Sequence, residues 1–159
     1  MRQKLIAAMQ EVFGADERRI KHALCVLEFA EYILAVEPGD ELTVVAAAIL
    51  HDIGMHEAER KYDSTAGRYQ ELEGPPIARK ILARLGVDAE CTEHICKIIA
   101  NHHSARAIDT PEFRIIWDAD WLVNIPDEYP QFSADRRRQL IEKVFRTPTG
   151  RQRALELFA

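Results

Sequence analysis

Apolar residues along the chain recur with the 3.6-residue period of an α-helix, and strand-like alternation never continues for more than a few residues. This pattern predicts an all-α fold, a compact helical bundle. Glycines, prolines and residues that cap helix N-termini divide the chain into elements. We expect helices at 3–13, 16–36, 40–54, 74–86, 88–102 and from 110 onward, and two C-terminal helices that follow Ser133 and Thr147.

Several helix starts have a clear N-cap residue. Asp40, Asp88 and Thr110 each precede a run with helical periodicity, and a proline follows Thr110 at the first helical position. Residues 54–74 have the least regular pattern of the chain, and His56 within them is expected to be a loop residue.

The length and the longest apolar run limit the class of protein. We expect residues 1–159 to form one domain, because 159 residues can bury a single core. The longest apolar run, Val44–Leu50, is far shorter than the ~20 residues of a membrane span. We therefore expect a cytoplasmic protein that does not bind a membrane, and its oligomeric state stays open.

Charge and cysteines change this picture little. The net charge is −5, but from Ser133 onward seven Lys or Arg face only three Asp or Glu. We interpret this basic segment as a solvated helix face and not as a nucleic-acid site. The three cysteines form no CxxC pair and are expected to be small buried apolar residues of a reducing compartment; they are Cys25, Cys91 and Cys96.

The apolar stretch "VVAAAILHDIGMH" ends on the adjacent pair His51-Asp52. The apolar residues before this pair surround the helix axis, which is typical of a helix buried on nearly all sides. A buried aspartate without a partner costs several kcal/mol, so Asp52 needs a cationic or hydrogen-bonding neighbour. A salt bridge or a hydrogen bond at the helix end is the ordinary explanation.

Three histidines on other helices share or adjoin an apolar stripe. Steps of 100° per residue place His22 beside Val26 and Ile33. His102 continues the isoleucine stripe of the preceding turns, and His103 lies one step round. Ordinary packing or surface exposure explains each histidine when it is taken alone.

The stretch "WDADWLVN" contains two aspartates with different surroundings. Asp118 falls on the polar side of its helix, four residues after Arg114, and is predicted to be a surface residue. Asp120 falls among apolar residues such as Phe113, and Asn124 on the same side could orient it. Four separate helices thus direct a His or an Asp inward, and such side chains on facing helices can build a divalent metal site.

The order His22, His51-Asp52, Asp120 resembles the H…HD…D signature of the HD superfamily of metal-dependent phosphohydrolases. Its flanks are similar too, in "RRIKHALCVLEFA", "AAAILHDIG" and "DADWL", so the resemblance covers about residues 16–125. It implies that His22, His51, Asp52 and Asp120 are the metal ligands, with Asp118 as second choice for the last.

The resemblance weakens at the segments that hold a second metal in some members. "IIANHHSAR" is similar to their later histidine segment, but "RYQELEGPPIAR" has Gln70, Glu71 and Glu73 where those members usually have a histidine. One metal is therefore favoured, with His102 or His103 as an acid, a base or a phosphate contact. Glu71 or Glu73 could still complete a second site.

The resemblance implies hydrolysis of a nucleotide or another small phosphate ester, by attack of metal-bound water on phosphorus. Asp52, His102 and His103 are the expected catalytic residues. Mixed His and carboxylate ligands suit Mn, Fe, Co, Ni or Zn, and Mg stays open. Three cations near the His-Asp pair or His103 along the chain are candidates for binding the phosphate: Lys61, Arg68 and Arg106.

Two other functions stay open. Some relatives of this type are di-iron oxygenases, which need additional histidine ligands, and no histidine stands near Gln70. A non-catalytic regulatory module that binds a metal and a nucleotide is the other alternative.

Overall fold

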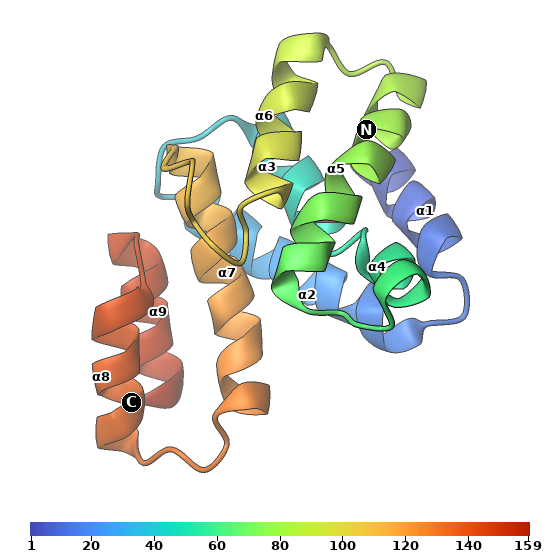
Figure 1. Ribbon diagram of the computed structural model, residues 1–159. Helices are drawn as coiled ribbons and strands as arrows, with labels where there is room; N and C mark the ends of the chain where they lie inside the picture. The colour runs from blue at the N-terminus through green and yellow to red at the C-terminus, as the bar shows by residue number, and fades with distance from the viewer.

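A computed structural model describes all residues from 1 to 159 and contains nine helices and no strand, which confirms the predicted all-α class (Figure 1). The helices are α1 (Arg2–Phe13), α2 (Glu17–Leu34), α3 (Glu41–Leu50), α4 (Met55–Tyr62), α5 (Gly67–Arg84), α6 (Ala89–Ile99), α7 (Pro111–Glu128), α8 (Ala134–Val144) and α9 (Pro148–Phe158).

Helix α3 lies at the centre of the molecule, in contact with α1, α2, α6 and α7 (Figure 1). Every residue from Thr43 to Leu50 is buried, as the run of apolar residues without a polar face predicts. The apolar residues Val44–Leu50 belong to one hydrophobic cluster that includes side chains from every helix except α4. The C-terminal end of α3 is therefore held in the interior of the protein.

The predicted N-caps are confirmed. The side chain of Asp40 accepts a hydrogen bond from the backbone N–H of Thr43, and Asp88 and Thr110 cap α6 and α7 in the same way. Ser133 and Thr147 cap α8 and α9. Local side-chain chemistry thus sets most of the helix starts.

Residues 54–74 are more regular than predicted, because they contain α4 and the first turns of α5. The prediction that a helix opens at 74 is wrong, since Pro75 and Pro76 lie inside α5. The helix continues through them although two N–H donors are lost. Just before the prolines it packs closely on the turn after α3: a Cβ on Gly54 would lie 2.5 Å from the Gly74 backbone nitrogen.

His56 is not a loop residue as predicted but lies in α4, where its Nε2 is 2.8 Å from a carboxylate oxygen of Asp16. Helices α3 and α6 end earlier than expected, at Leu50 and Ile99. His51-Asp52 therefore lies in the turn directly after a buried helix. The expected burial of the cysteines is confirmed only for Cys96, because Cys25 and Cys91 are partly exposed, and all three are free thiols.

The prediction that Asp118 is a surface residue is wrong. Its side chain is fully buried, and Arg114 pairs instead with Asp109 at 2.8 Å. The Asp118 carboxylate accepts hydrogen bonds from the backbone N–H of Arg146 (2.8 Å) and from the N–H (2.7 Å) and hydroxyl (2.6 Å) of Thr147. The polar side of α7 is covered by α9, a neighbour that the angles of a single helix cannot reveal.

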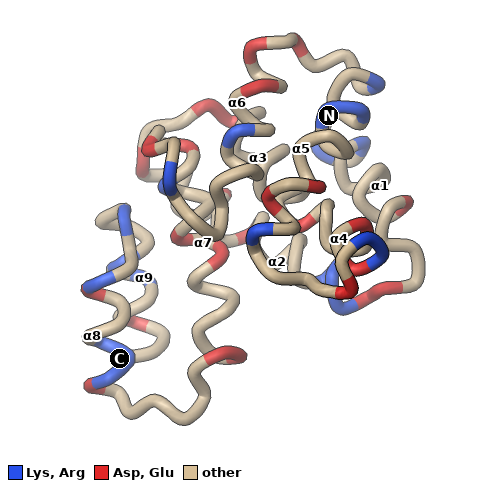
Figure 2. Tube along the Cα trace, viewed as in Figure 1, with Lys and Arg blue, Asp and Glu red and all other residues tan.

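Helices α8 and α9 form a hairpin beside α7, and Figure 2 shows Lys and Arg along both of them. Several of these cations have partners within the chain. Arg146 lies over the Trp117 ring, Arg151 and Arg153 pair with acids of the hairpin, and Arg137 donates to the Pro130 carbonyl. No helix of the protein is long and apolar enough to cross a membrane.

We expect Asp118→Ala to lower the free energy of unfolding by about 3 kcal/mol, because three buried donors would lose their charged acceptor. Burial raises the pKa of Asp118 to about 6 although the three donors oppose this shift, so urea unfolding is best measured at pH 8, where the carboxylate is ionised. Asp109→Ala removes the exposed ion pairs with Arg114 and Arg146 and is the matched control. Equal effects of the two substitutions would contradict this role of Asp118.

Candidate metal centre

The backbone fixes the orientation of the His51 ring. His51 follows the last residue of α3, is fully buried, and its Nδ1 lies 2.7 Å from the carbonyl oxygen of Ala48. Because a carbonyl only accepts, Nδ1 carries the hydrogen. Nε2 is thereby directed at the neighbouring polar side chains.

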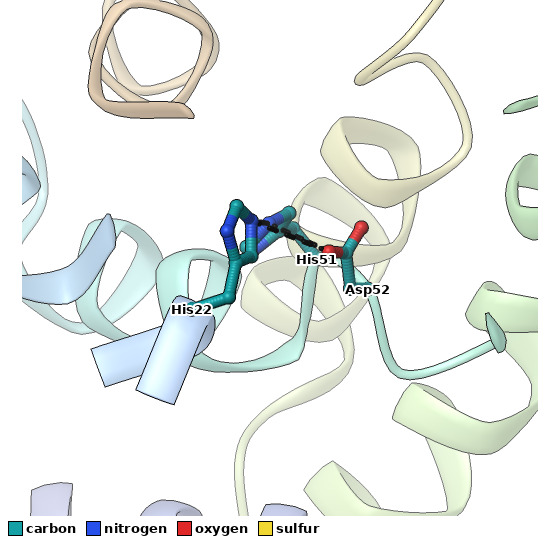
Figure 3. Close-up of side chains that lie close together, drawn as sticks. All are labelled: His22, His51 and Asp52. Carbon is teal, nitrogen blue, oxygen red and sulfur yellow. Dashed lines mark hydrogen bonds and ion pairs between the residues drawn. The ribbon is translucent and has the colours of Figure 1, made fainter. Parts of the chain in front are cut away.

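Three side chains approach this nitrogen, those of His22, Asp52 and Asp120, and Figure 3 shows the first two of them with His51. The Nε2 of His22, from α2, lies 3.2 Å from the Nε2 of His51 and 3.1 Å from Oδ1 of Asp120, from α7. Asp52 Oδ2 lies 3.4 Å from both ring nitrogens, and Asp120 Oδ1 lies 3.5 Å from His51 Nε2. The structure thus brings together His22, His51, Asp52 and Asp120.

This cluster attracts positive charge. Burial alone would lower the pKa of His51, but the carboxylates of Asp52 and Asp120 outweigh it and hold the pKa well above its ordinary value. Burial alone would raise the pKa of both carboxyls, but His51 with His102 lowers that of Asp52, and His22 with His51 lowers that of Asp120. Two carboxylates and imidazole nitrogens that share one point fit a divalent cation.

His102 repeats the arrangement of His51 after another helix, α6, whose last two residues are buried. It follows α6, its side chain is buried, and its Nδ1 donates to the carbonyl oxygen of Ile99 at 2.7 Å. Its Nε2 lies 3.2 Å from Oδ1 of Asp52. The two oxygens of Asp52 therefore face different partners, Oδ2 the cluster with His22 and His51, and Oδ1 the ring of His102.

Ligand atoms of Asp52, His102 and His103 also lie within 4.8 Å of one another, so these residues form a second group that could hold a cation. Neither Glu71 nor Glu73, the acids considered for a second site, belongs to this group. The Glu71 carboxylate accepts from the backbone N–H of His103 and from Ser104, and Glu73 accepts from the side chains of Lys61 and Tyr62.

A cleft of about 650 Å³ opens beside the cluster, and its walls include His22, Asp52, Asp120, His103 and Gln70. Asn124 lines the cleft but makes no hydrogen bond to Asp120. The remaining lining comes mainly from α2 and α7, with Arg18, Arg19, Lys21, Cys25, Met55, Thr65, Val123, Asp127 and Glu128.

The predicted phosphate contacts do not line this cleft. Lys61 pairs with Glu73 at 3.0 Å, Arg68 donates to the hydroxyl of Tyr69, and Arg106 is exposed. These three cations are close in sequence to the His-Asp pair or to His103, but in the structure they lie outside the cleft.

Cations from α2 line the cleft instead. Arg19 is paired with Asp16 at 2.9 Å, whereas Arg18 and Lys21 make no ion pair within the chain. Arg18 precedes His22 by one helical turn, so both lie on the same helix face. That spacing is the sequence signal that could have identified Arg18.

A family model for the HD domain matches residues 19–125. The matched span is more than half of the chain and includes His22, the His51-Asp52 pair and Asp120. Comparison with curated proteins and with solved structures gave no match.

We expect Mn²⁺, Co²⁺, Ni²⁺ or Zn²⁺ to raise the melting temperature, because a ligand that binds only the folded state at 100 times its Kd stabilises it by about 2.7 kcal/mol. Asp120→Asn keeps the shape of the side chain but removes its charge, and should abolish the shift. Asp109→Asn, at an exposed position, should retain it. Differential scanning calorimetry measures the shift, and a full shift in Asp120→Asn would exclude Asp120 as a ligand.

Proposed function

The chain belongs to the HD domain family of metal-dependent phosphohydrolases, and we propose that it hydrolyses a nucleotide or another small phosphate ester in the cleft beside His22. The convergence of two imidazoles and two carboxylates from α2, from the turn after α3 and from α7 is the observation that carries this proposal. A cation bound by these residues would offset the negative charge on the phosphoryl group during its transfer.

His22, His51, Asp52 and Asp120 would hold one divalent cation. When bound, the cation would polarise a phosphoryl oxygen and lower the pKa of a bound water. Mixed nitrogen and carboxylate ligands suit Mn, Fe, Co, Ni or Zn better than Mg.

His102 is suited to hold a proton for the leaving group. Its Nδ1–H is already donated to Ile99, so its Nε2 and the Asp52 oxygen at 3.2 Å share a hydrogen bond only if one of them carries a proton. His102 is buried, whereas Asp52 lines the cleft, so we propose that this proton passes by way of Asp52 to the ester oxygen as its bond to phosphorus breaks. His103, on the cleft wall, is the candidate contact for the attacking water.

Arg18 and Lys21 would bind the phosphate, because they line the cleft on the helix that carries His22 and have no acid partner of their own. A charge-assisted hydrogen bond to phosphate contributes about 1.5–3 kcal/mol. These residues replace Lys61, Arg68 and Arg106 in our assignment.

We expect the full chain to hydrolyse at least one member of a panel of nucleotides and small phosphate esters tested with Mn, Co, Ni, Zn and Mg. Asp52→Ala should lower kcat at least about 1000-fold, because it removes a metal ligand and the partner of His102 together. Asp109→Ala is the matched control and should retain full activity. Undiminished activity of Asp52→Ala would exclude this site.

Elemental analysis distinguishes the alternatives. Two irons per chain would favour an oxygenase that also uses the second group of ligands, Asp52, His102 and His103. Absence of turnover over the whole panel, with one bound metal, would favour a regulatory module.

We expect Arg18→Ala to raise the KM for the best substrate of the panel about 10-fold, with a smaller change in kcat, because the lost contact binds phosphate before and during the reaction. Arg138→Ala changes an exposed arginine on α8 and serves as control. An unchanged KM in an Arg18→Ala, Lys21→Ala double variant would remove both residues from the phosphate site.

A further inference from the structure

A buried glutamine determines which nitrogen of His103 carries the hydrogen. Gln70 is 4% exposed, and its side-chain Nε2 donates to the carbonyl oxygen of Thr65 at 2.6 Å. Because that carbonyl only accepts, the amide can have only one orientation, and its oxygen faces His103. The Gln70 Oε1 lies 2.9 Å from Nε2 of His103, which must therefore be the donor.

The opposite nitrogen of the ring is left as an acceptor. His103 Nδ1 has no hydrogen-bond partner within the chain, whereas Nδ1 of His51 and of His102 donates to a backbone carbonyl. One ring nitrogen of His103 lies within 4.8 Å of a carboxylate oxygen of Asp52. His103 therefore carries its hydrogen on Nε2, whereas His51 and His102 carry theirs on Nδ1.

The position of the ring is fixed as well. A Cβ on Gly67 would lie 2.8 Å from the His103 side chain, so the start of α5 packs directly on it. The ring centroid of His102 lies 4.0 Å away on another side. The Glu71 carboxylate accepts from the backbone N–H of both His103 and Ser104, which holds the turn. Helix α5 therefore sets both the place and the protonation of this imidazole.

We propose that Gln70 is a positioning residue that keeps the hydrogen of His103 on Nε2, so that Nδ1 accepts a hydrogen bond from the water that attacks phosphorus. This role rests on the proposed phosphohydrolase function. Gln70 stands in the segment where the family resemblance predicts a histidine ligand in dinuclear members, and here its side chain bonds to His103 and to the carbonyl of Thr65.

Nitrogen NMR of the full chain labelled in histidine tests the positioning directly. We expect His103 to show a protonated Nε2 and an unprotonated Nδ1, in the protein as isolated and after addition of Zn²⁺. Gln70→Leu keeps the volume but removes the acceptor, and should convert His103 to a mixture of both forms. Gln70→Glu cannot donate to Thr65 as a carboxylate but keeps an acceptor for His103, and it should retain the Nε2–H form.

Gln139→Leu, on the exposed side of α8, is the matched control and should leave all histidine signals unchanged. Thermal unfolding of each variant shows whether the fold is retained. A hydrogen on Nδ1 of His103 in the unaltered chain, or an unchanged signal in Gln70→Leu, would overturn the positioning.

Kinetics test the catalytic consequence. Gln70→Leu should lower kcat about 10-fold and leave KM within twofold, because the lost contact orients a water and not the substrate. The double variant with His103→Ala should be no slower than His103→Ala alone, whereas independent structural effects would multiply.

The NMR and the kinetic measurements test different parts of the proposal, and either can contradict its part alone. Multiplicative losses in the double variant, or two zinc ions per chain with a Zn²⁺-induced shift of His103 Nδ1, would overturn the role of His103 in orienting water. Absence of turnover in the unaltered chain would overturn the proposed function and this role with it, while the NMR result would still decide whether Gln70 positions His103.

Discussion

The partly buried carboxylate of Asp52, at the end of a helix without any polar face, is the constraint on which the other polar residues of the interior depend. Its side chain is 13% exposed and has three imidazole nitrogens within 3.4 Å. A carboxylate in such a place is stable only when positive charge or hydrogen-bond donors surround it. His22 of α2 and the histidines that come after α3 and α6, His51 and His102, meet this requirement, and they also form the candidate site.

The site is held by a device that the fold uses twice. The last residues of α3 and α6, Leu50 and Ile99, are buried, and the histidine that comes after each helix donates its Nδ1–H to the carbonyl three residues before. This bond satisfies a carbonyl that the helix end leaves free, and it directs Nε2 outward. The packed helix ends thereby fix the orientation of the rings of His51 and His102.

Periodicity predicted the features that lie within one helix. The stripe of His22, the apolar setting of Asp120 and the position of His102 follow from angles, so the residues that meet at Asp52 could be named from the sequence and the family motif. Asp118 could not be placed, because α9 packs from a distant part of the chain onto its side of α7. Arg18 and Lys21, which line the cleft, were not predicted, because the phosphate contacts were chosen by their distance in sequence from the histidines. The position of Arg18 one turn before His22 on α2 was the informative signal.

The environment of Asp118 also bears on what constitutes the folding unit. The family match ends at residue 125, yet the three donors that satisfy the Asp118 carboxylate come from Arg146 and Thr147. A chain that stopped at residue 125 would lack α9, which covers the side of α7 that carries Asp118, two residues before Asp120. We therefore infer that the C-terminal hairpin is part of the same folding unit, because the carboxylates of α7 are satisfied from two sides, one by imidazoles of the site and the other by the start of α9.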